Sequence, residues 1–148
     1  MLPWVGKGLW PANISPKKRI NMNFLKKTIA PILLATIWIS ISEFVRNEFF
    51  VKSYWTDHYG SLGLVFPGEP INGAVWGLWS LLFAIAIFII SKKFNLLQTT
   101  FLSWFTGFVL MWVVVWNMDV FPIGILVIAA PLSILEAFLA SFIIKKLS

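Results

Sequence analysis

The chain has 148 residues, of which 59% are hydrophobic and 12% are charged, and its formal net charge is +6. A soluble globular domain is about 45–50% apolar, so this composition excludes an ordinary soluble domain and indicates an integral membrane protein. The lack of cysteine excludes disulfides and thiolate-bound zinc or iron–sulfur clusters. The single histidine, His58, excludes haem held by two histidines of one chain, and we expect no cofactor. The basic residues flank apolar runs, where topology and lipid head groups account for them, so we expect no nucleic-acid partner.

The chain begins with a basic stretch that lacks helical periodicity. Residues 1–24 contain Pro, Gly and isolated Trp, and they predict a basic cytoplasmic or interfacial tail. From Met22, basic residues followed by an apolar run have the order of a secretory signal peptide, but no clean small-residue cleavage site follows. We therefore interpret this run as a retained first span, with Met22 as a second candidate start of the natural chain.

Four apolar segments are long enough to cross a bilayer, since a span needs about 20 mostly apolar residues. They lie at about 28–46, 73–91, 97–117 and 121–144. The short connections predict that residues 25–148 form a single all-α domain, an up-down-up-down bundle of four transmembrane helices. Only Arg46 and Lys52 of the twelve basic residues fall on one side of this topology. The positive-inside rule therefore places both termini in the cytoplasm (N-in/C-in), and we expect the cytoplasmic (inner) membrane of a bacterium.

Two patterns predict which faces of the spans meet inside the bundle. In the first span, polar residues at spacings of four, three and four share one helical face: Thr36, Ser40, Glu43 and Asn47. This face is either a packing seam or the wall of a water-accessible cleft. Small residues that permit close helix contacts follow one another in the second span (Gly73, Gly77, Ser80, Ala84) and in the fourth (Ala129, Ser133, Ala137, Ser141).

An aromatic-rich external loop is predicted at about 47–72, as a short helix that continues the first span, followed by a loop that rests on the bundle. It contributes to a candidate outer-face site whose groups suit a cation, a lipid head group or a polar solute: Glu43, Arg46, Asn47, Asp57, His58 and Asp119. No metalloprotease or hydrolase motif is present, and no acidic pair has metal-ligand spacing, so we expect neither catalytic residues nor a metal site. We interpret His58 as an interfacial residue with a local hydrogen bond.

Glu136 is the one acidic residue in the middle of a predicted span. It lies nine residues before Lys145, which is about 13 Å inside the membrane boundary at 1.5 Å per residue. A charge there costs at least about 2.5 kcal/mol. No Lys, Arg or His lies at the same depth when residues are counted from the membrane boundary. We therefore expect a protonated, hydrogen-bonded side chain unless water or a bound cation reaches it. Hydroxyls at or near that depth complete a candidate intramembrane site: Glu136, Thr36, Ser40, Ser80, Ser103 and Thr106.

Three roles for Glu136 remain open: a neutral tie between helices, a proton- or cation-binding group, and a contact with a polar residue of a partner. The chain resembles the small multidrug resistance transporters in architecture, because it has a similar size, four spans and a glutamate within the membrane. Their essential glutamate lies in the first helix and their external connections are short, so the resemblance implies architecture and not membership.

The leading functional interpretation is a non-catalytic accessory subunit or a small binding or transport module. One alternative is a dimeric proton- or cation-coupled transporter of a small solute that uses Glu136. The other is a membrane enzyme or lipid-modifying factor with its site at the outer face. Candidate partners are the lipid bilayer, a second copy of the chain, a larger membrane complex, and a small solute or cation.

Overall fold

The computed structural model describes residues 22–148, and all regular structure in that range is helical. Four helices are long and apolar enough to cross a membrane: Met22–Phe50, Pro70–Ser91, Leu96–Asn117 and Ile123–Leu147. The prediction of an all-α chain with four candidate spans is confirmed, and these helices indicate a multi-pass membrane protein. The predicted tail lies outside the described residues, except for its last three positions.

The long helices are not uniformly α-helical. The first consists of α1 (Met22–Phe24), the π-helical turn η1 (Leu25–Ile29), α2 (Ala30–Val45) and a second π-helical turn, η2 (Arg46–Phe50). The short helix α3 (Lys52–Ser61) follows, and then α4 (Pro70–Ser91). The third long helix consists of α5 (Leu96–Trp104), the π-helical turn η3 (Phe105–Val109) and α6 (Leu110–Asn117). The fourth begins with the 3₁₀ turn η4 (Ile123–Ile125) and continues as α7 (Leu126–Leu147). Since π-helical turns occur frequently at functional sites, η2 and η3 mark places to look for one.

Side-chain hydrogen bonds define the turn between α4 and α5. Asn95 caps α5, because its side chain accepts from the backbone N–H of Gln98 at 2.9 Å while the Gln98 side chain accepts from the backbone N–H of Asn95 at 3.2 Å. The ammonium of Lys145, near the end of α7, donates to the backbone carbonyls of Ser91 at 2.9 Å and Phe94 at 2.7 Å. The Ser91 carbonyl belongs to the last residue of α4, where helix geometry leaves acceptors without partners. The Phe94 carbonyl lies in the turn and also accepts from the Thr99 hydroxyl at 3.3 Å. The turn therefore joins three of the long helices.

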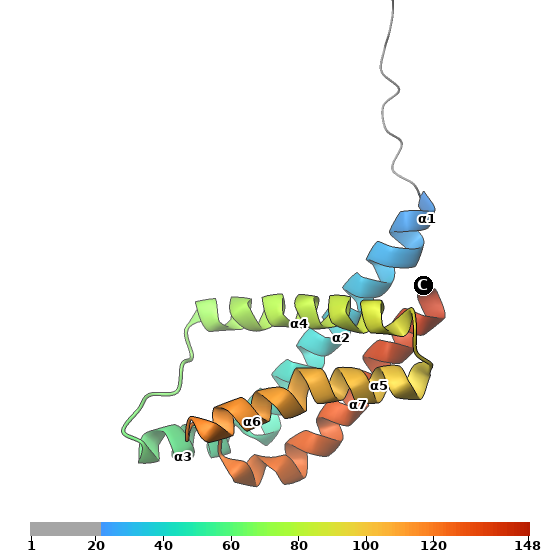
Figure 1. The fold of residues 1–148 in the computed structure, drawn as a ribbon. Helices are drawn as coiled ribbons and strands as arrows, with labels where there is room; N and C mark the ends of the chain where they lie inside the picture. The colour runs from blue at the N-terminus through green and yellow to red at the C-terminus, as the bar shows by residue number, and fades with distance from the viewer. Residues whose placement is uncertain (1–21) are drawn as a thin grey trace, which may run out of the picture.

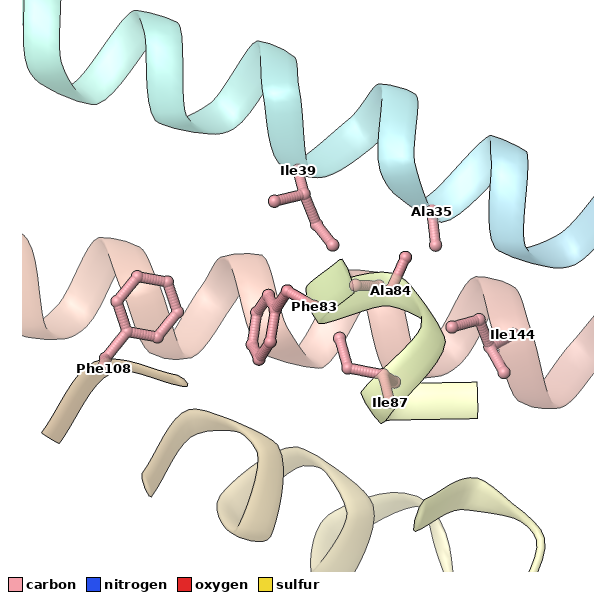
Figure 2. Close-up of a cluster of buried hydrophobic side chains, with 8 residues drawn as sticks. Ala35, Ile39, Phe83, Ala84, Ile87, Phe108 and Ile144 are labelled. Carbon is pink, nitrogen blue, oxygen red and sulfur yellow. The ribbon is translucent and has the colours of Figure 1, made fainter. Parts of the chain in front are cut away.

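Figure 1 shows the chain reversing direction at the short turn between α4 and α5, which lie side by side, while α2 and α7 cross them obliquely. Helices α2, α4, α5 and α7 pack on one another around an apolar core. The core side chains come from four long helices: Ala35, Ile39, Phe83, Ala84, Ile87, Phe108, Ala140 and Ile144. In Figure 2, Phe108 lies at one end of this group and Ile144 at the other. Phe108 therefore forms the end of the core that contacts Arg46 of η2.

The small residues of α7 pack inside the bundle, as predicted. Ala129, Ser133, Ala137 and Ser141 are all buried. Ser133 also accepts a hydrogen bond from the indole N–H of Trp104 at 2.9 Å, which joins α7 to α5. This face of α7 is a close contact between helices, as expected for small residues in a membrane.

The small residues of α4 divide into two groups. Ser80 and Ala84 are buried, but a Cβ placed on Gly73 or Gly77 would have no atom of a neighbouring residue within 4 Å. The prediction of a tight contact is therefore wrong for this end of α4. The glycine that does permit a close approach is Gly107, where a Cβ would lie 2.5 Å from the Phe83 ring.

Candidate functional site

The carboxyl group of Glu136 is fully buried and bonds to the first long helix. Its Oε2 accepts from the hydroxyl of Ser42 at 2.7 Å and from Nη1 of Arg46 at 3.1 Å. The indole N–H of Trp38 donates to the backbone carbonyl of Glu136 at 3.1 Å. Three donors on α2 and η2 therefore hold one residue of α7.

Arg46 links Glu136 to a second carboxylate. Its Nη2 forms an ion pair with Glu43, and its guanidinium lies over the ring of Phe108, 5.1 Å from the centroid. The side-chain amide of Asn47 donates to Oε2 and to the backbone carbonyl of Glu43, both at 2.9 Å. The side chains of Arg46 and Glu43 are 7% and 5% exposed, so the ion pairs are almost fully shielded from solvent. We call Glu43, Arg46 and Glu136 the carboxyl–guanidinium cluster.

The cluster forms because the first long helix and α7 run in opposite directions. Val51 at the end of the first helix packs with Ile125 and Ala129 at the beginning of the fourth. Side chains on a helix lean toward its N-terminus, so those of Arg46 and Glu136 lean toward each other. Arg46 is also the first residue of the π-helical turn η2, and Phe108 lies in the π-helical turn η3. Both irregular turns therefore adjoin the cluster.

The expectation that no basic residue reaches Glu136 is wrong, because Arg46 bonds to it directly. Counting residues from the membrane boundary gives the depth of each Cα atom. The guanidinium of Arg46 extends several ångströms from its Cα, so it reaches a depth that the count does not assign to it. The cluster contains two carboxyl groups and one guanidinium, so its net charge is −1 when both carboxyls are ionised and zero when they hold one proton. Buried charge is costly, and the neutral state is the less costly one.

The predicted hydroxyl partners of Glu136 lie elsewhere in the bundle. Thr36, Ser80 and Thr106 donate to backbone carbonyls of their own helices, at 2.8, 3.0 and 2.9 Å respectively. Ser103 is buried and its hydroxyl has no hydrogen-bond partner in the described part of the chain, and Ser40 is half-buried. Short hydroxyl side chains in a helix readily bond to the carbonyl four residues earlier. Lying at the same depth as Glu136 was therefore not enough to make these hydroxyls its partners.

The predicted outer-face residues separate into two groups. Glu43, Arg46 and Asn47 lie together in and beside the cluster. His58 donates from Nε2 to the backbone carbonyl of Asp119 at 2.9 Å, at a turn where Asp119 has φ 59°. Asp residues tolerate this left-handed conformation better than most. Asp57 is exposed and bonds to neither group. The six side chains therefore do not form one site.

A small cavity adjoins the cluster at the end of the bundle that carries α3. Its volume is about 30 Å³, which exceeds the roughly 10–15 Å³ that a water molecule requires. Glu43, Arg46 and Asn47 line it together with three indole rings, those of Trp55, Trp76 and Trp112. Glu136 does not line it. The cavity therefore has room for one water molecule beside Glu43 and Arg46, and it does not reach Glu136.

The sequence-based interpretation missed Trp38 and Ser42 as partners of Glu136. A signal for them exists: Trp38, Ser42 and Arg46 follow one another at spacings of four, which places them on one face of a helix. That face is adjacent to the polar face through Glu43 and Asn47, and the two faces together surround the cluster.

The chemistry available at the cluster is that of carboxyl groups, a guanidinium and an amide. Carboxyl groups bind protons and cations, and a guanidinium binds carboxylates and phosphates. Within residues 22–148, no group of three His, Cys, Asp or Glu side chains is placed to hold a metal ion. Comparisons of the chain with known protein families, with curated proteins and with solved structures found no match.

Proposed function

We propose that the protein is a small non-catalytic binding or transport module of the bacterial cytoplasmic membrane, with the carboxyl–guanidinium cluster as its binding centre. One observation carries this proposal: Glu43, Arg46 and Glu136 are all buried between the first helix and α7. Apolar side chains of similar volume would hold these helices at equal or lower free-energy cost. The small residues of α7 and the apolar core already supply helix contacts. The three ionisable groups therefore have a use other than stability.

The proposal includes an up-down-up-down topology with both termini in the cytoplasm. Its support is the distribution of basic residues and the contact of Lys145 with the turn that carries Lys92 and Lys93, which gathers these charges at one end. In this orientation α3 and the cavity face the outside. A solute would thus approach the cluster from the outer side, and one larger than water would enter only if the cavity of about 30 Å³ lined by Glu43 and Arg46 widened.

The enzyme alternative has no support from the geometry. His58 bonds to a backbone carbonyl rather than to an acidic side chain, and it does not meet Glu43 or Asp57. A second candidate function, proton- or cation-coupled transport, is favoured by the proximity of the Glu43 and Glu136 carboxyls on either side of Arg46. Because Glu136 does not line the cavity, a transported solute would reach it only after a change of conformation.

Removing the whole cluster tests the proposal. In the triple variant Glu43→Leu/Arg46→Met/Glu136→Leu, no buried charge is left without a partner, so the variant should be at least as stable as the natural protein. The matched control replaces an exposed ion pair on the first helix and α3 with Glu48→Leu/Lys52→Met. Thermal unfolding of each protein in lipid nanodiscs is measured across a panel of pH values, alkali cations, small amines and small carboxylates.

We expect at least one member of the panel to raise the unfolding midpoint of the natural protein and of the control. The triple variant should not respond to that member. If all three proteins respond alike across the panel, the cluster is a structural tie and the proposed binding function is wrong.

A further inference from the structure

We propose that the cluster is a proton-binding site in which Glu43 and Glu136 hold one proton between them, and that Glu43 exchanges this proton with water in the cavity. This inference rests on the proposed function, because it names the ligand and the route of access for the same cluster. The exchange breaks the O–H bond of the Glu43 carboxyl. The proton passes to a cavity water to give hydronium, and the electron pair stays on the carboxylate.

The balance of charges at the cluster sets the number of protons. Arg46 is the cation that contacts both carboxyls, through Nη1 to Glu136 and through Nη2 to Glu43. The other elements packed around them contribute Phe108 from η3, Trp112 from α6 and other side chains that do not titrate. One guanidinium neutralises one carboxylate, so the second carboxyl avoids a buried net charge by binding a proton.

The geometry of the carboxyls suits a shared proton. Nη1 and Nη2 of one guanidinium contact Glu136 and Glu43 respectively, so the two carboxyls lie beside each other, and one of them can donate a hydrogen bond to the other once it is protonated. Oε1 of Glu136 is buried and accepts no hydrogen bond from any side chain or backbone group of residues 22–148. A hard metal cation requires about six oxygen ligands and would lie beside the positive charge of Arg46. A proton requires one donor oxygen and one acceptor oxygen, which the pair provides.

The route of exchange follows from which carboxyl meets the cavity. Glu43 is 4% exposed and lines the cavity of about 30 Å³, whereas Glu136 is 0% exposed and does not line it. A cavity of this size holds a water molecule when polar groups surround it, and Glu43, Arg46 and Asn47 are such groups. Water therefore meets the pair at Glu43, and the proton of Glu136 leaves through Glu43.

Infrared spectroscopy of the full chain in nanodiscs at neutral pH tests the shared proton, because a protonated carboxyl has a C=O band distinct from that of a carboxylate. We expect one such band, and we expect it to shift in heavy water. It should disappear in Glu43→Gln and equally in Glu136→Gln, since each variant leaves one carboxylate matched by Arg46. Glu48→Gln, at an exposed ion pair, should retain the band. The Gln variants keep shape and hydrogen bonding, and circular dichroism is the check that they are folded.

Filling the cavity tests the route. Ala129 is a buried residue that lines it, and Ala129→Val places two methyl groups there. The variant should retain the band but exchange its proton for deuterium at least about tenfold more slowly. Ala130→Val, at the neighbouring half-buried residue that does not line the cavity, is the control.

Each outcome is informative. If the natural protein has no protonated-carboxyl band, or if the band survives both Gln substitutions, there is no shared proton. If Ala129→Val exchanges at the natural rate, Glu43 is not the route. Binding of a solute in the thermal panel without the infrared band would leave the proposed function standing and would overturn this inference alone.

Discussion

Replacing Arg46 with glutamine should destabilise the protein more than any other single loss of charge in the described part of the chain. Arg46 donates to Glu136 at 3.1 Å and pairs with Glu43, and hydrogen bonds to charged groups contribute about 1.5–3 kcal/mol each. Its contact with the Phe108 ring at 5.1 Å adds about 0.5–2 kcal/mol. The glutamine amide retains part of the hydrogen bonding of Arg46. The two carboxyls can also bind protons from water, which removes their uncompensated charge. We therefore expect a loss of about 3–5 kcal/mol, the usual cost of breaking a buried ion pair.

The assay is the free energy of unfolding in mixed micelles, followed by tryptophan fluorescence as the denaturing detergent is increased. Lys52→Gln is the matched control, because Lys52 and Glu48 form an ion pair at 2.5 Å with side chains 53% and 40% exposed. An exposed pair of this kind contributes at most about 1 kcal/mol. Arg46→Lys keeps the charge but loses the planar fork that contacts two carboxylates, so its loss should lie between the two.

If uncompensated carboxylates cause the loss, neutralising them should reverse it. The triple variant Glu43→Gln/Arg46→Gln/Glu136→Gln should recover at least about half of the free energy lost in Arg46→Gln, since the three residues form one network and their effects are not additive. Equal losses in Arg46→Gln and Lys52→Gln would refute the reasoning. So would a triple variant less stable than Arg46→Gln alone.

Two further predictions concern topology and packing. Single cysteines at Ser61 and Ser148 should react with a membrane-impermeant reagent from outside and inside the cell respectively; labelling in the reverse sense would invert the proposed orientation. Gly107→Ala should cost about 1–3 kcal/mol, because its Cβ would lie 2.5 Å from the Phe83 ring. A Cβ at Gly77 would have open space around it, so Gly77→Ala should be neutral or stabilising by up to about 1 kcal/mol. If Gly107→Ala and Gly77→Ala shift the thermal midpoint in the same direction, the packing described is wrong.

The four spans were predictable because hydrophobic length is a property of sequence alone. The predicted segment 73–91 and the observed helix Pro70–Ser91 end at the same residue, and the predicted 97–117 differs by one residue from Leu96–Asn117. The first helix, Met22–Phe50, extends beyond the predicted span 28–46 at both ends, and at its second end it continues through the π-helical turn η2. Polar and charged residues after Arg46 lowered the apolar signal there, although the backbone remained helical.

The burial of Glu136 was also predictable, because a carboxyl facing hydrocarbon is costly. Its partners were not, for a reason of geometry. Counting along each helix assigns depth to Cα atoms, whereas Arg46 and Glu136 lean toward each other from different depths on helices of opposite direction. Trp38, which bonds to the backbone of Glu136, is closer to the depth that counting gave. Arg46, eight residues further along the same helix, reached the carboxyl only through its side chain.

The small residues show a second limit of the sequence. Gly77 and Ala137 belong to similar patterns of small residues at spacings of three or four, yet Ala137 is fully buried, whereas a Cβ added to Gly77 would have no neighbour within 4 Å in the described part of the chain. Lipid and protein are equally apolar surroundings for such a residue. A pattern of small residues therefore indicates that a close contact is feasible, and only the fold decides whether one is made.

The bond from Lys145 to the turn after α4 has a consequence for biogenesis. In the proposed orientation Lys145 belongs to the charges that keep a span end on the cytoplasmic side during insertion. The same ammonium then donates hydrogen bonds to the carbonyl of Ser91, at the end of α4, and to that of Phe94 in the turn. Because Lys145 follows the fourth span in the chain, these two bonds can form only after that span has been synthesised. In the proposed orientation, the turn between α4 and α5 therefore gains its last contacts late in insertion.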